Sequence, residues 1–192
     1  MKPLSLFSKA VLGWFDEHGR HDLPWQHNKT PYRVWVSEIM LQQTQVVTVI
    51  PYYQRFMDSF PNVQALASAT SDEVLHHWTG LGYYARARNL HKCAQTIVND
   101  YEGEFPRDAE LLEGLSGIGR STAGAIASIS MGMDSAILDG NVKRVLSRFH
   151  AIEGWPGNKK ISDAMWIIAE GYTPKKRTGD YTQAMMDLGA TL

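Results

Sequence analysis

Residues 115–123 read LSGIGRSTA, and residues 137–141 read ILDGN. In the first segment two glycines flank Ile118, and a run of small residues that suits a helix begins directly after them. Glycine has no Cβ, so the backbone can turn sharply at these positions and approach a ligand closely. The unpaired amides that open the next helix lie at the positive end of its dipole, where a phosphate binds well. The sequence therefore predicts a glycine turn between two helices, with a phosphate site at its tip.

A Gly-x-Gly turn on its own is more often an ordinary connection between helices than a binding site. No strand is expected before it and no Gly-x-x-x-x-Gly-Lys follows, so the nucleotide-binding motifs do not apply. Here the turn is followed by Arg120 and, 20 residues after Gly119, by Asp139 just before another expected helix. This combination resembles the helix-hairpin-helix and Gly/Pro-rich-loop-Asp element of the DNA glycosylases related to endonuclease III.

Composition sets bounds on any function. The chain has 192 residues, 44% of them hydrophobic, which is enough for one domain or two small lobes. Basic and acidic residues nearly balance, at 19 and 20, so a uniformly basic coat for nucleic acid is excluded and DNA must be bound by local patches. The basic clusters, each of which would equally suit a solvated helix face, are Arg86/Arg88/His91/Lys92, Lys143/Arg144/Arg148, Lys159/Lys160 and Lys175/Lys176/Arg177.

Cys93 is the only cysteine, so the chain offers neither a disulfide framework nor a set of metal ligands. No apolar stretch approaches the roughly 20 residues that cross a membrane, and no signal peptide is evident. We therefore expect a cytoplasmic protein, associated with the nucleoid if bacterial, that has no membrane partner.

Helical periodicity recurs along the chain and no segment alternates as a strand does, so an all-α fold is predicted. Glu38, Gln42 and Gln45 lie at i, i+4 and i+7 spacing, which predicts a polar stripe on one helix face. Such a stripe is most often solvent-exposed, and it gains interest only beside a second carboxylate. The expected helices cover about residues 4–18, 31–45, 46–60, 70–78, 84–101, a short segment from 108, 120–133, 140–149, 159–170 and 180–188.

Caps and apolar stripes are expected on several of these helices. Thr30 would cap the helix that starts at Pro31, and Thr70 and Glu73 would form a capping box. The apolar residues at helical spacing, which are expected to face a core, are Phe7, Val11, Trp14 and Phe15, then Tyr32, Val36, Ile39 and Met40, and then Val142, Val145, Leu146 and Phe149.

Five segments extend the resemblance over nearly the whole chain. They are residues 23–25 (LPW), 36–45 (VSEIMLQQTQ), 80–90 (GLGYYARARNL), 139–145 (DGNVKRV) and 183–190 (QAMMDLGA). Together they are similar to the MutY family of adenine DNA glycosylases. The resemblance implies the helix-hairpin-helix DNA glycosylase fold. Its six-helix barrel would span residues 28–135, with the helix-hairpin-helix at about 108–132, and both chain ends, 1–27 and 136–192, would form a second helical lobe.

The resemblance also implies an activity and a partner. Family members remove adenine mispaired with 8-oxoguanine or guanine from double-stranded DNA, and we expect a monomer. They continue into four cysteines that bind a [4Fe-4S] cluster and then into a domain that recognises 8-oxoguanine. This sequence ends at Leu192, before those cysteines. No cofactor is therefore expected in this chain, and the cluster is expected only in a full-length family member.

Two carboxylates would share the chemistry implied by the resemblance. Glu38, if buried with the base, would have a raised pKa and protonate adenine at N7 as a general acid. Asp139 lies at a helix N-terminus, where the dipole and free amides favour its ionised form. It would stabilise the sugar cation or act as a transient nucleophile. The plainer interpretation makes Asp139 only a helix N-cap.

A base inside a duplex must flip out to be reached. By resemblance, Gln42 and Tyr83 would wedge into the gap that adenine leaves in the stack. The adenine pocket would be lined by Arg20, Leu23, Trp25 and Gln183. Leu23 and Trp25 would equally suit a hydrophobic core, and Gln183 would equally suit a helix cap.

Contacts to the DNA backbone position the duplex without reading its sequence. The residues that the resemblance assigns to them are Gly117, Gly119, Arg120, Ser121, Asn141 and Lys143, with a monovalent cation at the carbonyls of Leu115 and Gly117. Ser121 stands where the endonuclease III branch carries a lysine that attacks the sugar. Serine cannot form a Schiff base, so a monofunctional glycosylase is predicted. Two alternatives remain: a bifunctional endonuclease III-like glycosylase/AP lyase for oxidised pyrimidines, and a non-catalytic helix-hairpin-helix DNA-binding fragment.

Overall fold

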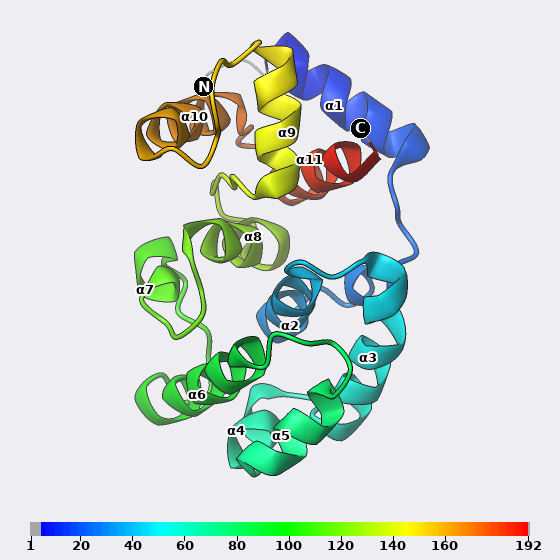
Figure 1. The fold of residues 1–192 in the computed structure, drawn as a ribbon, viewed down its shortest axis with the longest axis vertical. Helices are drawn as coiled ribbons and strands as arrows, with labels where there is room; N and C mark the ends of the chain where they lie inside the picture. The colour runs from blue at the N-terminus through cyan, green and yellow to red at the C-terminus, as the bar shows by residue number, and fades with distance from the viewer. Residues whose placement is uncertain (1–4, 192) are drawn as a thin grey trace. The chain divides into compact units, whose positions relative to one another are not determined.

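A computed structural model describes residues 5–191, and all regular structure within them is helical (Figure 1). The predicted all-α fold is thus confirmed. The elements are α1 (Leu6–His18), η1 (Pro24–Gln26, a short 3-10 helix), α2 (Pro31–Leu41), α3 (Val46–Ser59), α4 (Val63–Ser68), α5 (Ser71–Trp78), α6 (Ala85–Asp100), α7 (Ala109–Glu113), α8 (Arg120–Met131), α9 (Gly140–Phe149), α10 (Lys159–Tyr172) and α11 (Thr178–Thr191). None of these helices has the length and apolar character needed to cross a membrane.

The chain forms two compact units. The central unit is Asp22–Ala123, and the terminal unit combines Met1–His21 with Gly124–Leu192. The lobes expected from the resemblance had other bounds, 28–135 and 1–27 with 136–192. Their description as a six-helix barrel and a second lobe stays a prediction.

Side-chain caps begin several helices where the sequence predicts them. Thr30 Oγ1 accepts the amide of Arg33 at 3.3 Å, with Pro31 at the first helical position. Thr70 and Glu73 form the expected capping box, in which each side chain bonds the other's backbone amide. These local bonds satisfy amides that have no partner within their own helix, so they fix where each helix starts.

The core of the central unit is built around large aromatic side chains. Trp35 of α2, Phe56 of α3 and Trp78 of α5 are completely buried. Trp35 packs edge-on against Phe105 at 5.4 Å between ring centroids, and Phe56 meets Trp78 at 6.1 Å. Burying each such side chain contributes about 1.5–3 kcal/mol, so these rings fix how α2, α3 and α5 pack. The predicted apolar stripe of α2, which is Tyr32, Val36, Ile39 and Met40, is buried as expected.

The predicted continuation of α2 is wrong. The helix ends at Leu41, so Gln42 and Gln45 do not share a helical stripe with Glu38. Gln42 is the C-cap, the next residue has a left-handed backbone with φ 56°, and Gln45 is the N-cap of α3. The helix stops here because the guanidinium of Arg86 takes up its last carbonyl groups.

The core of the terminal unit is formed by α1, α9, α10 and α11. Val11 and Phe15 of α1 pack with Val142, Val145 and Leu146 of α9, as predicted. Phe149 was predicted to face inward as well but is 56% exposed, because it is the last residue of α9, and one side of its ring contacts Phe7 with 4.5 Å between centroids. The close approach of α11 to α9 depends on Gly189, since a Cβ there would lie 2.5 Å from the Asn141 carbonyl oxygen.

Candidate functional site

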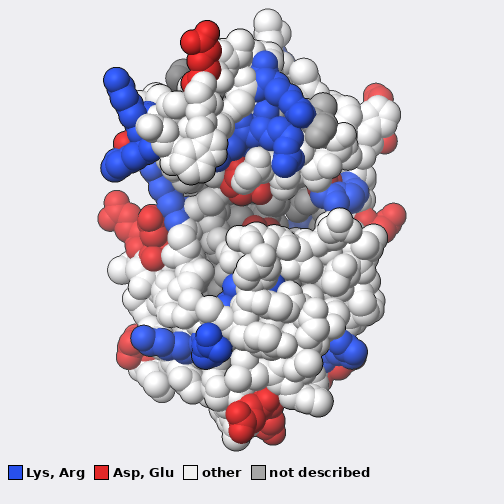
Figure 2. Space-filling model, in the orientation of Figure 1, with Lys and Arg blue, Asp and Glu red and all other residues white. Residues whose placement is uncertain are grey.

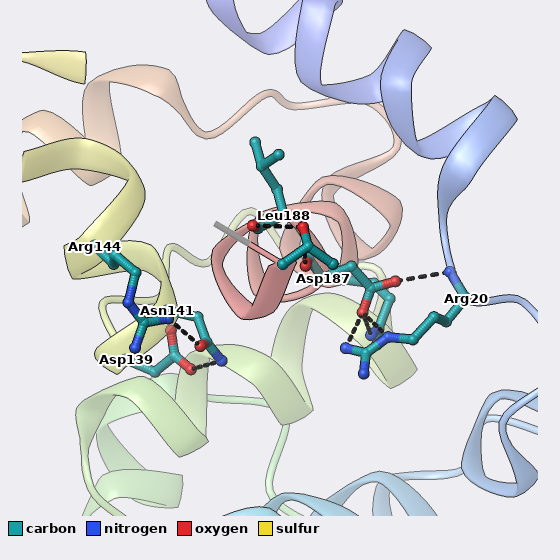
Figure 3. A network of polar contacts seen from close by, with 8 residues as sticks. Arg20, Asp139, Asn141, Arg144, Asp187 and Leu188 are labelled. Atoms are coloured by element: carbon teal, nitrogen blue, oxygen red, sulfur yellow. Dashed lines mark hydrogen bonds and ion pairs between the residues drawn. The ribbon is translucent and has the colours of Figure 1, made fainter. Parts of the chain in front are cut away.

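Asp139 is the N-cap of α9, at the position the sequence predicts. Its Oδ1 accepts the Val142 amide at 2.8 Å. Asn141 Nδ2 donates to its Oδ2 at 3.2 Å (Figure 3). Burial raises the pKa of Asp139 above its ordinary value, although these hydrogen bonds act in the opposite direction. The net direction is opposite to the one expected from the helix N-terminus, because desolvation outweighs the bonds. The carboxyl is therefore held in place and partly desolvated.

Arg144 extends this network toward the end of α11. Its NH1 donates to Asn141 Oδ1 at 3.1 Å and also to the carbonyl of Gly189. Asn141 was expected to contact the DNA backbone, but in this structure both ends of its amide are engaged, one by Asp139 and one by Arg144 (Figure 3). The chain Gly189–Arg144–Asn141–Asp139 thus connects the backbone of α11 to the predicted catalytic carboxylate.

Asp187 forms a second polar centre in the same unit. Its side chain is 1% exposed and accepts four N–H bonds. The Arg20 side chain donates at 3.0 Å from Nε and 2.5 Å from NH2, the Arg20 amide donates at 2.9 Å, and Gln183 Nε2 donates at 3.0 Å. A buried carboxylate is stable only when it is paired and hydrogen-bonded in this way. The structure therefore brings together Arg20 and Gln183, two of the residues predicted to line the adenine pocket.

Asp187 lies in one of the segments that carry the resemblance, residues 183–190, but no role is predicted for it from the sequence. The available signal was the i, i+4 spacing of Gln183 and Asp187 on one helix. The decisive partner, Arg20, is 167 positions away in the sequence, so no local pattern could identify it.

The other predicted pocket residues lie in the central unit. The ring of Trp25 is buried and meets Tyr53 edge-on at 5.4 Å, as a core residue would. Leu23 is half-buried at the N-cap of η1. Glu38 lies on the last turn of α2 and is also half-buried. Glu38 belongs to the central unit and Asp139 to the terminal unit, and their service to one pocket stays a prediction.

The two predicted wedge residues are both solvent-exposed. Gln42 caps α2, and Tyr83, 62% exposed, has a left-handed backbone with φ 50°. Arg86 contacts both, since NH1 donates to the Gln42 carbonyl at 2.5 Å and the guanidinium lies 5.4 Å from the centre of the Tyr83 ring. Exposed side chains on a fixed backbone are what a DNA wedge requires.

The predicted glycine turn is present, and of its two glycines Gly117 has a left-handed backbone whereas Gly119 does not. Leu115 and Ile118 are buried and anchor it, whereas Gly117 and Gly119 are exposed. Gly117 has φ 78°, and a Cβ there would lie 2.8 Å from the Cβ of Asn89 on α6. Glycine is therefore required at 117 both by the left-handed backbone and by the close approach of α6.

A small cavity of about 40 Å³ lies beside this turn in the central unit. Its volume suits water rather than a nucleobase. The residues around it are Trp35, Ile39, Gln42, Arg86, Asn89, Leu90, Ser116 and Gly117. One predicted wedge residue, Gln42, and one glycine of the predicted phosphate site, Gly117, therefore line the same small cavity.

The remaining predicted contacts with the DNA backbone lie at the starts of two helices. Arg120 opens α8 and is exposed, with Ser121 half-buried next to it. Lys143 is half-buried on the first turns of α9. On the face drawn in Figure 2, Lys and Arg side chains form separate groups among acidic and uncharged surface. This face therefore has local basic patches and no continuous basic coat.

Two inorganic groups follow from the resemblance, a monovalent cation at the glycine turn and a [4Fe-4S] cluster, and the residues that could hold each can be compared. The Leu115 carbonyl accepts the Ile118 amide at 3.1 Å and keeps a second lone pair for another partner, and a monovalent cation at the Leu115 and Gly117 carbonyls stays a prediction. A [4Fe-4S] cluster needs four thiolates, whereas the chain has one cysteine and Cys93 is buried on α6. The cluster therefore does not fit the residues of this chain.

Comparison with known proteins agrees with this geometry. Residues 36–170 match the family described as HhH-GPD superfamily base excision DNA repair protein. The chain is 51% identical over 187 residues to the adenine DNA glycosylase of Buchnera aphidicola subsp. Acyrthosiphon pisum (strain APS), covering 97% of this chain and 53% of that protein. It is 46% identical over 198 residues to the Homo sapiens adenine DNA glycosylase, covering 98% of this chain and 36% of that protein. The chain thus spans about half the length, or less, of these relatives.

Solved structures show the same fold. A thermostable thymine-DNA glycosylase superposes with a TM-score of 0.86 at 26% identity, covering 96% of this chain and 85% of that one. Endonuclease III in a non-covalent DNA complex superposes with a TM-score of 0.77 at 20% identity, covering 94% and 81%. The predicted helix-hairpin-helix glycosylase fold is therefore confirmed.

Proposed function

This chain belongs to the HhH-GPD superfamily of base excision DNA repair proteins, and on that premise we propose that it is the catalytic part of an adenine DNA glycosylase. The reaction would hydrolyse the N-glycosidic bond of adenine mispaired with 8-oxoguanine or guanine in double-stranded DNA. The observation that carries the proposal is the 51% and 46% identity to adenine DNA glycosylases over 97% and 98% of this chain.

Two carboxylates divide the chemistry in this proposal. Glu38 would protonate adenine at N7 and so make it a better leaving group. Asp139 would stand beside the developing oxocarbenium as an anion, or attack it as a transient nucleophile. The hydrogen bonds that Asp139 accepts from Val142 and Asn141 support its anionic form against the cost of burial.

The Asp187 carboxylate supports a preference for adenine. An ionised carboxylate only accepts hydrogen bonds, so the Gln183 amide must turn its NH₂ toward Asp187. Its carbonyl oxygen would then be the group that the side chain offers to a base, as an acceptor. An acceptor suits the N6 amino group of adenine, which donates, and is mismatched to the O6 of guanine, which accepts. Arg20 is oriented by the same carboxylate.

The chain would bind double-stranded DNA as a monomer. It would do so in the cytoplasm, at the nucleoid if the protein is bacterial. Gln42 and Tyr83 would fill the gap left by the flipped adenine. The turn at Gly117 and Gly119, with a monovalent cation at the Leu115 and Gly117 carbonyls, would contact a phosphate, as would the first turn of α9. Ser121 provides no amine for a Schiff base, so the proposed activity is base removal without strand cleavage.

A single-turnover assay on a duplex with one adenine:8-oxoguanine pair tests the proposal. We expect the chain to release adenine and Glu38→Gln to release none while still binding the duplex. Glu104→Gln, an exposed acidic residue of the same unit, is the matched control and should retain the wild-type rate.

The two alternatives give different products in the same assay. A bifunctional glycosylase/lyase would cleave the strand and give an efficient borohydride-trapped adduct that depends on turnover. A non-catalytic DNA-binding fragment would bind the duplex without adenine release, and Glu38→Gln would behave as wild type. Either result would replace the proposed function.

A further inference from the structure

Arg86 lies at the start of α6 and reaches back to the end of α2. Its NH1 donates to the carbonyl oxygens of Ile39 at 2.9 Å, Met40 at 3.0 Å and Gln42 at 2.5 Å. These carbonyls belong to the last turn and cap of α2, where no amide of the helix remains to bond them. A cation at a helix C-terminus is also favoured by the helix dipole. Arg86 therefore ends α2 and fixes the backbone of Gln42.

The second terminal nitrogen of Arg86 contacts two further loops. NH2 donates at 3.3 Å to Thr44 Oγ1, to the Leu81 carbonyl and to the Gly82 carbonyl. The Arg86 amide in addition bonds the carbonyl of Tyr83 at 2.9 Å. One side chain thus connects the loop after α2 with the turn before α6, two segments that are far apart in the sequence.

The rings beside Arg86 complete this arrangement. The guanidinium lies 5.4 Å from the ring centres of both Trp78, which is buried, and Tyr83, which is exposed. Tyr83 and Gln43 both have left-handed backbones, with φ 50° and 56°, which bulky side chains rarely adopt. Such conformations persist only where neighbouring groups determine them, and Arg86 is the group that contacts both segments.

The Arg86 side chain donates to six oxygens, five backbone carbonyls and one hydroxyl, and none of them is charged. The charge is therefore balanced by carbonyl dipoles, and the geometry depends on a planar fork with two terminal nitrogens. Lysine has the charge but a single nitrogen, so it cannot reach both loops at once. From the sequence, Arg86 belongs to a basic cluster that would suit DNA binding or a solvated helix face. In the structure its guanidinium bonds groups of the protein itself.

We propose that Arg86 is a positioning residue that holds Gln42 and Tyr83 as one wedge against the DNA duplex. The inference rests on the proposed function, because that function supplies the wedge. A wedge must keep its place while the base stack closes on it, so its two side chains need a common support. Arg86 provides this support without contacting the reacting atoms.

The test compares Arg86→Lys with Arg55→Lys, a matched control whose guanidinium lies 4.6 Å over the Tyr52 ring in the same unit. At saturating protein, adenine release from an adenine:8-oxoguanine duplex should fall about 10- to 100-fold in Arg86→Lys, because small displacements of positioning groups cost this much. Arg55→Lys should stay within about twofold of wild type. An unchanged rate in Arg86→Lys would overturn the inference.

A double-mutant cycle separates positioning from general destabilisation. In a Gln42→Ala/Tyr83→Ala background the wedge is absent, so Arg86→Lys should lower the rate by less than about twofold further. The full effect in that background would contradict the inference. Fluorescence of 2-aminopurine placed next to the target adenine should show reduced unstacking in Arg86→Lys and in the wedge variant alike, and normal unstacking in Arg86→Lys would also overturn it.

Amide hydrogen exchange gives a readout that does not need catalysis. Exchange in segments 42–45 and 82–85 should be faster in Arg86→Lys, with α10 unaffected, and unchanged exchange would refute the inference. If wild type releases no adenine, the proposed function fails, while this measurement still decides whether Arg86 orders the two loops. If Arg86→Lys does not fold, Thr44→Val, which removes one acceptor, should speed exchange in 42–45, and the absence of that change would overturn the inference.

Discussion

The carboxylate of Asp187 is 1% exposed and accepts hydrogen bonds from both Nε and NH2 of Arg20, at 3.0 and 2.5 Å. These residues lie at opposite ends of the sequence, so the ion pair ties the end of α1 to α11. The Gln183 amide bonds the same carboxylate, so one buried charge fixes both side chains that we assign to the adenine pocket.

Asp187→Ala should lower the free energy of unfolding by about 2–4 kcal/mol, because it leaves Arg20 and Gln183 without their acceptor. The lower end of this range is favoured since Arg20 is 37% exposed and water can replace part of the bond. Urea denaturation at pH 7 measures the change. Asp16→Ala is the control, because Asp16 forms an ion pair with Arg177 at the same 2.5 Å distance but on the surface. Its loss should lower the free energy of unfolding far less. An equal decrease in the free energy of unfolding in the two variants would show that burial of the Asp187 ion pair adds nothing to its contribution.

Asp139→Asn should raise stability at neutral pH while abolishing base release. Burial raises the pKa of Asp139, so the folded state binds its proton more tightly than the unfolded state does. The favourable contribution is thus complete below the unfolded pKa and is lost as pH rises through the folded pKa. Asparagine stays neutral at every pH and remains a good N-cap for Val142.

Urea denaturation of wild type and Asp139→Asn, at pH 7 and below the ordinary aspartate pKa, checks this prediction. The variant should be the more stable at pH 7, and the difference should disappear in acid. A variant that is less stable at pH 7, or a difference independent of pH, would show that the carboxylate is stabilised rather than strained by its site.

Local signals in the sequence predict those parts of the fold that depend on neighbouring residues. The caps at Thr30, Thr70 and Asp139 and the turn at Gly117 are set within a few positions, and all of them are confirmed. The helix Val63–Ser68, which was not predicted, is too short to show a periodic pattern.

Features that depend on long-range partners could not be predicted. The end of α2 at Leu41 is set by Arg86, which is 46 positions from the Met40 carbonyl that it bonds. The burial of Asp187 likewise depends on Arg20. For the candidate site, motifs predict a role for individual residues, whereas only the folded chain shows which of these residues contact each other.

Gly117→Ala should destabilise the protein by about 1–3 kcal/mol. The residue has φ 78°, and the added Cβ would lie 2.8 Å from the Asn89 Cβ. Gly119→Ala has no atom within 4 Å of its added Cβ and no left-handed φ, so it should change stability by less than about 1 kcal/mol, in the stabilising direction. Thermal denaturation of the two variants measures the difference. Equal melting temperatures would show that the turn relaxes away from α6 at little cost.

Gly189→Ala should slow base release although position 189 is not among the proposed catalytic residues. An added Cβ would lie 2.5 Å from the carbonyl oxygen of Asn141, so α11 must move away from the start of α9. The Gly189 carbonyl accepts Arg144, which bonds the Asn141 side chain and through it Asp139. A displacement is therefore passed directly to the carboxylate that would stabilise the sugar cation. We expect a loss of about 1–3 kcal/mol in stability from overpacking and a rate about 10- to 100-fold lower at saturating protein.

Gly171→Ala on α10 is the control for Gly189→Ala, since its added Cβ meets nothing within 4 Å. An alanine at this open position in the last turn of α10 should stabilise the protein by up to about 1 kcal/mol and leave the rate unchanged. Single-turnover rates and urea denaturation of both variants separate the two effects. If Gly189→Ala loses stability but keeps the wild-type rate, Asp139 does not depend on the packing of α11 against α9. If the rate falls and the NMR signal of the Asn141 side-chain amide shifts in Gly189→Ala but not in Gly171→Ala, the hydrogen-bond chain from Gly189 to Asp139 sets the position of the carboxylate.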